Sequence, residues 1–250
     1  MDYKTGNPAL SDKTFQGLTR PSDAAGPMTL QGTVNRALML LAMLLATALW
    51  SWGQFFSHAG DPSVLTLPMM GGLVGGFVLA LIISFKQTTA PYLALPYAAL
   101  EGLAIGGISA IMEKRYPGIA IQAAELTFGV LATLLVAYSL RLIHVTERFK
   151  SIVVAATGAI ALVYLVSFVL SFFHINMPLL NDASPMGLLI SGVIIVVAAL
   201  NLVLDFSFIE SGVAQGAPRY MEWYSAFGLM VTLVWLYLEI LRFLGKARQR

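Results

Sequence analysis

The chain has 250 residues, of which 58% are hydrophobic and only 11% are charged, whereas average soluble domains carry roughly 25% charged residues. Its formal net charge is +2, and the basic residues lie between hydrophobic runs, so no basic stripe is present and we expect no nucleic-acid partner. The absence of cysteine excludes disulfides, iron–sulfur clusters and thiol catalysis. This composition predicts a polytopic protein of the lipid bilayer.

The first 32 residues mix charged residues with glycine and proline and contain no apolar run. We predict that residues 1–32 form a flexible cytosolic tail. The first hydrophobic segment begins too late and is too long for a secretory signal peptide, so we expect it to act as an uncleaved membrane anchor.

Seven hydrophobic segments follow, each close to the roughly 20 residues that cross the hydrocarbon core of a bilayer. They are Val34–Phe55, Leu65–Phe85, Tyr92–Met112, Ile119–Ile143, Ile152–Phe173, Met186–Ile209 and Tyr220–Leu244. Backbone polar groups cannot stay unpaired in lipid, so segments of this length must be helices. The sequence therefore predicts an all-α integral membrane protein, a seven-helix bundle over residues 33–246.

The distribution of lysine and arginine between the segments indicates the orientation in the membrane. The side of the membrane that holds the N-terminus carries more lysine and arginine than the opposite side. The side richer in these residues is usually cytoplasmic. We therefore expect a multi-pass protein of the cell (inner) membrane with a cytoplasmic N-terminus. Basic residues at the C-terminal end fall on the opposite side in this count, so the sequence does not decide on which side of the membrane the C-terminus lies.

Glycine recurs at four-residue spacing in the second and third segments. The positions are Gly71, Gly72, Gly75 and Gly76, then Gly102 and Gly106. Such spacing allows two helix backbones to approach closely in lipid. The pattern predicts tight packing of the second helix against the third.

Asp205 and Glu101 are two of the acidic residues inside the predicted spans. Placing an aspartate at mid-bilayer costs about 2.5–3.5 kcal/mol on insertion scales, so Asp205 is expected to face the bundle interior. Asn201 precedes it by one turn on the same helix face. Glu101 lies at the centre of its segment and must be either protonated or paired, as a hydrogen-bonding contact between helices or as part of an ion or proton path.

Polar residues of the last segment share one helix face with two leucines. The spacing alternates between three and four along Glu222, Ser225, Leu229, Thr232, Leu236 and Glu239. This polar seam predicts that the last helix lies near the middle of the bundle and lines a cavity opposite Asp205. In the alternative interpretation, Glu222 and Glu239 are interfacial residues beside Arg219 and Arg242.

The sequence carries no enzyme signature. The three histidines fall at or near the ends of the hydrophobic segments, and no His-Glu-x-x-His motif is present. The last segment contains no lysine before Lys246, which excludes a retinal Schiff base of the rhodopsin kind. We therefore expect no enzymatic activity and no organic cofactor.

Three stretches carry a resemblance to a known family. They are Thr33-Val34-Asn35-Arg36-Ala37-Leu38-Met39-Leu40-Leu41, then Leu204-Asp205 with Ile209, and Leu236-Tyr237-Leu238-Glu239-Ile240-Leu241-Arg242-Phe243-Leu244-Gly245. In their order and spacing the chain resembles the Bax inhibitor-1 family, the transmembrane BAX inhibitor motif proteins, and specifically the bacterial YccA-like group. The similarity covers roughly Thr33 to Gly245.

The resemblance implies a helical bundle with a proton-sensitive pathway that leaks calcium. In family members that act as leak channels, two aspartates on the last two helices share a proton. Asp205 matches the first, whereas Thr232 stands where the second would be. The candidate residues for an ion or proton pathway are Asp205, Asn201, Glu101, Glu222 and Thr232, with calcium as the candidate ion and no firm metal ligand.

Two functional hypotheses follow. The first is a pH-sensitive calcium (cation) leak channel. The alternative is a non-conducting modulator that binds another membrane protein, such as a quality-control protease, through its flexible tail. A solute transporter ranks below both, because the two halves of the sequence show no obvious repeat.

Overall fold

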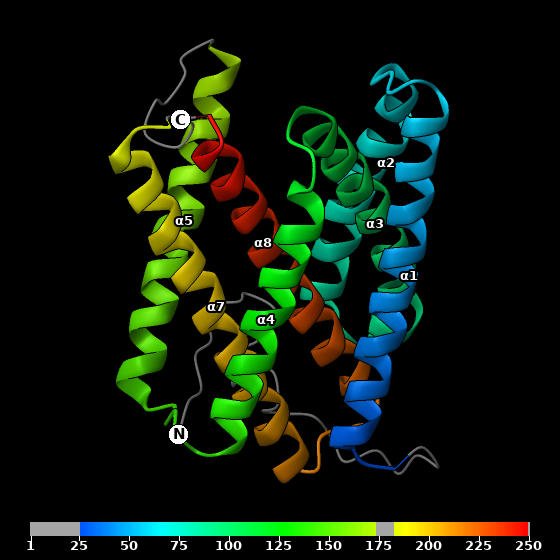
Figure 1. Ribbon diagram of the computed structural model, residues 1–250. Helices are drawn as coiled ribbons and strands as arrows, with labels where there is room; N and C mark the ends of the chain where they lie inside the picture. Colours follow the sequence, from blue (N-terminus) through cyan, green and yellow to red (C-terminus); the bar gives the residue numbers. More distant parts are fainter. Residues whose placement is uncertain (1–25, 174–182, 250) are drawn as a thin grey trace. The chain divides into compact units, whose positions relative to one another are not determined.

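The computed structural model describes residues 26–173 and 183–249 (Figure 1). Its α-helices are α1 (Leu30–Ser57), α2 (Ser63–Phe85), α3 (Ala90–Arg115), α4 (Ile119–Ser139), α5 (Glu147–Phe172), α7 (Pro185–Ala214) and α8 (Met221–Ala247), with a short 3₁₀ helix, η2 (Gln87–Thr89). All seven are long and apolar enough to cross a membrane. The prediction of an all-α polytopic membrane protein is confirmed.

The helix boundaries differ from the hydrophobic segments at several ends, for local reasons. α1 begins at Leu30 because the Thr29 hydroxyl accepts a hydrogen bond from the Gly32 backbone N–H. Residues 1–25 of the predicted tail lie outside the described residues.

α4 stops at Ser139, short of the predicted Ile143, where Arg141 takes a left-handed φ of 57°. The Leu142 N–H then bonds back to the Ala137 carbonyl, which closes the helix.

The chain divides into two compact units. Among the described residues, unit 1 contains 121–173, 183–206 and 232–249, and unit 2 contains 26–120 and 207–231. Helices α7 and α8 therefore each contribute one part to each unit.

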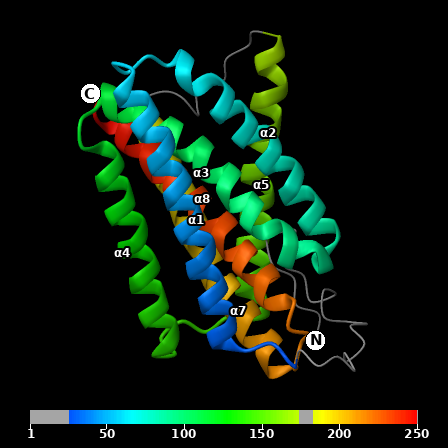
Figure 2. The ribbon, with the colours of Figure 1, turned by 90° about the vertical axis from the view of Figure 1, so that its right-hand side faces the viewer.

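In unit 2, α3 packs against both α1 and α2 (Figure 2). A Cβ atom added at Gly72 of α2 would lie only 2.4 Å from the Leu100 carbonyl oxygen of α3, whereas one at Gly71 would meet nothing within 4 Å. The predicted close packing of the second and third helices is confirmed. Gly102 and Gly106 face α1 instead, since a Cβ at Gly106 would lie 2.3 Å from the Ala48 carbonyl oxygen.

In unit 1, side chains from four helices contact one another. Thr157 of α5 accepts a hydrogen bond from Asn201 of α7, and the Tyr164 hydroxyl of α5 donates to Glu239 of α8. Tyr138 of α4 packs its ring against Phe206 of α7, with 5.8 Å between ring centroids. Helix α5 thus connects the polar positions of α7 and α8 within this unit.

Helix α8 has the largest buried share among the seven spans. Within unit 2 it contacts α1 and α3, and within unit 1 it contacts α5 and α7. All four polar members of the predicted seam, Glu222, Ser225, Thr232 and Glu239, are at most 3% exposed. The expectation that the last helix buries its polar face is confirmed.

Candidate functional site

Asp205 lies on α7 with 1% of its surface exposed, among the buried residues Val203, Leu204 and Phe206. Neither carboxylate oxygen accepts a regular hydrogen bond from the described part of the chain. The Thr232 hydroxyl of α8 is directed at this carboxylate, but the two groups do not form a hydrogen bond of regular geometry. A buried carboxylate without donors is stable only if it holds a proton or a cation, because the bare charge is strongly disfavoured there.

Asn201 lies one turn before Asp205 and is buried, and its side-chain amide donates two hydrogen bonds. Its Nδ2 donates to the Thr157 hydroxyl oxygen at 2.7 Å and to the Val197 carbonyl oxygen at 2.9 Å. The structure therefore brings three of the five predicted pathway residues, Asp205, Asn201 and Thr232, together in unit 1.

Glu222, which belongs to unit 2, is engaged in a different set of contacts. Its carboxylate accepts hydrogen bonds from the Thr29 backbone N–H at 3.1 Å and the Thr29 hydroxyl at 2.9 Å. It also pairs with Arg36 at 3.5 Å and Arg219 at 4.0 Å. The absence of a side chain at Gly32 leaves room for the Glu222 carboxylate, because a Cβ atom at this position would overlap it. Glu222 therefore binds the N-terminus of α1, where an anion is favoured by the helix dipole.

The residues preceding α1 are also attached to the turn between α7 and α8. The Met28 backbone N–H donates to the Ala217 carbonyl oxygen at 2.7 Å, and Pro27 forms an isolated bridge with Pro218. This attachment, together with the Glu222 contacts, favours the interpretation of Glu222 as an interfacial structural residue. The sequence pattern indicated Arg219 as its partner but gave no signal for Arg36 or Thr29.

Glu101, also in unit 2, is half-buried on α3 rather than fully buried. Its Oε2 atom would lie 3.0 Å from a Cβ at Gly76 of α2, so the carboxylate packs against the glycine face of that helix. Glu101 takes part in none of the ion pairs found among the described residues. Its position makes Glu101 a contact between α2 and α3.

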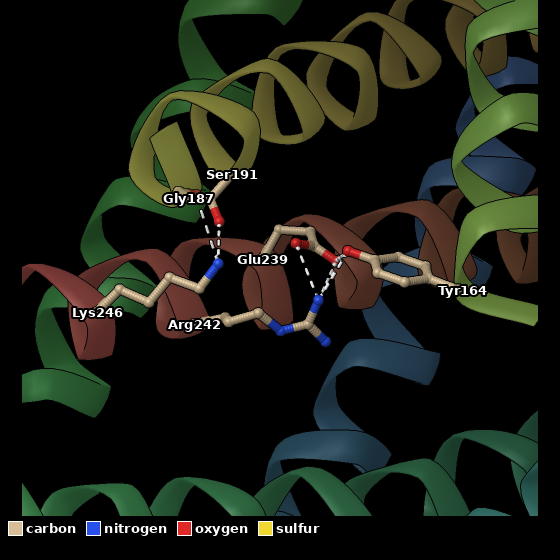
Figure 3. A network of polar contacts seen from close by, with 6 residues as sticks. All are labelled: Tyr164, Gly187, Ser191, Glu239, Arg242 and Lys246. Atoms are coloured by element: carbon tan, nitrogen blue, oxygen red, sulfur yellow. Dashed lines mark hydrogen bonds and ion pairs between the residues drawn. The ribbon is translucent and has the colours of Figure 1, made fainter. Parts of the chain in front are cut away.

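A second polar network in unit 1 was only partly visible in the sequence (Figure 3). Glu239, 1% exposed, accepts a hydrogen bond from the Tyr164 hydroxyl at 2.6 Å and pairs with Arg242 at 3.3 Å. Buried Lys246 donates to the Ser191 hydroxyl oxygen at 2.8 Å. Helical spacing indicated the Glu239–Arg242 pair, but Tyr164 and Ser191 come from distant positions in the chain.

The described residues contain no group of three or more histidine, cysteine or acidic side chains that could hold a metal ion. A cation bound at Asp205 would therefore depend on one carboxylate supplemented by hydroxyl and amide oxygens. Such oxygen ligands suit a hard cation, but a single charge gives weak binding.

The fold and this site define a polytopic α-helical membrane protein with a buried aspartate in the span before the last. The family model described as Bax inhibitor 1 like matches residues 7–249, nearly the whole chain. The chain therefore belongs to the Bax inhibitor 1 like family, while its place in the YccA-like group stays a prediction. No curated protein and no solved structure matches the chain.

Proposed function

We propose that the protein is a slow cation leak, with calcium as the principal ion, controlled by protonation of Asp205. The observation that carries this proposal is the buried Asp205 carboxylate, which lacks a regular hydrogen-bond donor in the described residues. Such a group is expensive to keep inside a membrane bundle, and intramembrane acids usually serve ion or proton movement. Family membership and the resemblance to leak channels support the same function.

The mechanism follows from the two forms of the acid. Protonated Asp205 is neutral, so the surrounding apolar side chains pack against it and no cation is attracted. Ionised Asp205 attracts a hard cation, which prefers carboxylate, hydroxyl and carbonyl oxygens. Thr232 and Asn201 are the neighbouring sources of such oxygens. Because one carboxylate gives weak affinity, the cation leaves as readily as it enters, which suits a leak.

The orientation proposed for this function places the N-terminus in the cytoplasm and the protein in the cell membrane. The basic residues near the ends of the spans support this arrangement.

A second candidate function, modulation of a membrane partner, is favoured by the attachment of the α1 N-terminus. Residues Pro27 to Thr29 connect the first 25 residues to the turn before α8 and to Glu222. A partner that binds the N-terminal residues would therefore act directly on the start of the last helix. In this candidate the protein conducts no ions and transmits binding through that contact.

The leak proposal is tested by building a second carboxylate beside Asp205. Thr232→Asp should raise calcium affinity at least about tenfold, because affinity follows the number of charged ligands, and the gain should vanish as pH falls. Thr232→Val, which removes the hydroxyl at nearly constant volume, should give no gain. The measurement is calcium binding to the purified variants over a pH series. Equal binding by the Asp and Val variants at every pH would contradict the proposal.

A further inference from the structure

Arg36 lies near the start of α1 and beside the first turn of α8, within unit 2. It is the last charged residue before the run from Ala37 to Gly60, which contains no lysine, arginine or acid and is long enough to cross a bilayer. Its guanidinium carbon lies 5.0 Å from the centroid of the Trp223 ring. Tryptophan is enriched at the boundary between membrane and water. Both residues therefore indicate that this junction of α1 and α8 lies at one edge of the bilayer.

The protein leaves hydrogen-bond donors of the Arg36 guanidinium available. The Nη2 atom pairs with Glu222 at 3.5 Å, an ion pair too long for a regular hydrogen bond. The Nε atom is buried and donates no hydrogen bond within the described part of the chain, while 22% of the side chain is exposed. Trp223 covers one face of the guanidinium, and its N–H groups point outward in the plane of the group. The outer edge is therefore left for an acceptor from outside the chain.

Positive charge exceeds negative charge within the cluster of Arg36, Arg219 and Glu222. The two arginines share the Glu222 carboxylate, at 3.5 Å and 4.0 Å. The Oε1 atom of Glu222 also accepts two hydrogen bonds from Thr29. Two guanidinium groups beside one carboxylate leave an excess of one positive charge. An arginine fork at the membrane boundary matches a phospholipid phosphate, whose oxygens accept two parallel N–H bonds.

The surface of α1 next to Arg36 suits the acyl chains of such a lipid. Met39 and Met43 follow Arg36 by three and seven residues, so the three side chains lie along one face of the helix. Both methionines are exposed. A free phosphate would contact only the guanidinium, whereas a lipid would also cover these two apolar side chains.

We propose that Arg36 and Trp223 form a binding site for the phosphate of an anionic phospholipid, in the leaflet on the side where α1 begins. The guanidinium edge donates two hydrogen bonds to the phosphate, while Trp223 holds the guanidinium face. Met39 and Met43 contact an acyl chain. The bound lipid neutralises the excess positive charge and connects the start of α1 to the start of α8. The site lies in unit 2 and does not depend on the leak proposal.

The test measures binding to the purified protein in detergent micelles by native mass spectrometry, with three probes. Phosphatidylglycerol carries both phosphate and acyl chains, diacylglycerol with the same chains lacks the phosphate, and glycerol phosphate lacks the chains. The protein should bind phosphatidylglycerol at least about tenfold more tightly than either other probe, because charge-assisted hydrogen bonds and apolar contacts both contribute. Diacylglycerol or glycerol phosphate binding as tightly as phosphatidylglycerol would overturn the proposal.

Variants then assign the phosphate to its residue. Arg36→Gln should weaken phosphatidylglycerol binding at least about tenfold and leave diacylglycerol binding unchanged, which also shows that the variant is folded. Arg36→Lys keeps the charge without the planar fork, so it should recover only part of the affinity. The matched control is Lys86→Gln, which removes an exposed positive charge between α2 and α3 in the same unit and should change the affinity by less than about twofold.

Two outcomes would contradict the assignment to Arg36. The first is phosphatidylglycerol binding by Arg36→Gln as tight as that of the wild type. The second is an equal loss in Arg36→Gln and Lys86→Gln, which would show a general attraction between basic residues and an anionic lipid rather than a site. Neither outcome involves Asp205 or ion flux, so failure of the leak proposal appears separately, as wild-type vesicles that pass no calcium.

Discussion

Asp205→Asn is expected to stabilise the folded protein by about 1–3 kcal/mol at neutral pH. The wild-type side chain is buried without a regular hydrogen-bond donor from the described part of the chain, which is costly whether the acid is neutral or charged. Asparagine has the same shape, cannot ionise, and brings N–H groups that can bond the oxygens of Asn201 and Thr232. Greater stability on removal of a residue is typical of a site kept for function at the expense of folding.

The measurement is the unfolding free energy of both proteins in mixed micelles, followed by circular dichroism. Asp61→Asn is the matched control, since Asp61 is an exposed acid in the turn before α2. Hydrogen bonds from the backbone N–H and hydroxyl of Ser63 lower the pKa of Asp61. That interaction stabilises the fold above the acid's unfolded pKa and is lost as pH falls, so its removal should not stabilise the protein. Loss of stability in Asp205→Asn would show that the wild-type carboxylate is well paired.

Gly72→Ala is expected to destabilise the protein by about 1–3 kcal/mol. Its new Cβ would lie 2.4 Å from the Leu100 carbonyl oxygen and 2.9 Å from the Ala104 nitrogen, so the backbones of α2 and α3 must separate. Gly71→Ala makes the same chemical change at the adjacent position, where nothing lies within 4 Å. Its effect should stay within about 0.5 kcal/mol.

The same unfolding assay measures both glycine variants. A similar loss of stability in the two would contradict the contact with α3 as the cause, because alanine has the higher intrinsic helix propensity and does not by itself destabilise a helix. The comparison is direct because the two glycines are neighbours in one helix and differ in the face they present.

The spans and their close contacts could be predicted from the sequence because two physical demands dominate in lipid. Apolar length determines which segments cross the membrane, and backbone groups must be paired within each helix. Glycine spacing also predicted the approach of α2 to α3. It could not show that Gly102 and Gly106 face α1, because spacing gives the face of a helix but not its neighbour.

The burial of Asp205 could be predicted because the cost of an acid in lipid depends on the residue alone. Helical spacing also indicated Arg219 and Arg242 as partners of Glu222 and Glu239. The remaining partners of these acids could not be predicted, since they come from distant parts of the chain. Glu222 shares a helix face with Thr232, which suggested a common pathway. Its carboxylate instead binds Thr29 and Arg36, residues that the local pattern of the last helix does not contain.

The sequence also could not predict Thr157 as the hydrogen-bond partner of Asn201. It is one of many threonines in apolar segments, and nothing in its neighbourhood along the chain distinguishes it. Only the structure shows that Thr157 accepts a hydrogen bond from Asn201, 44 residues further on, and donates its own proton to the Val153 carbonyl oxygen.

Calcium flux into proteoliposomes over a pH series, wild type against Asp205→Asn, tests the central claim most directly. The wild-type protein should admit calcium at a rate that rises as Asp205 loses its proton, and Asp205→Asn should show no such rise at any pH. Equal flux in the two proteins across the series, or no flux in either, would contradict a leak controlled by Asp205. The latter result would favour the modulator function.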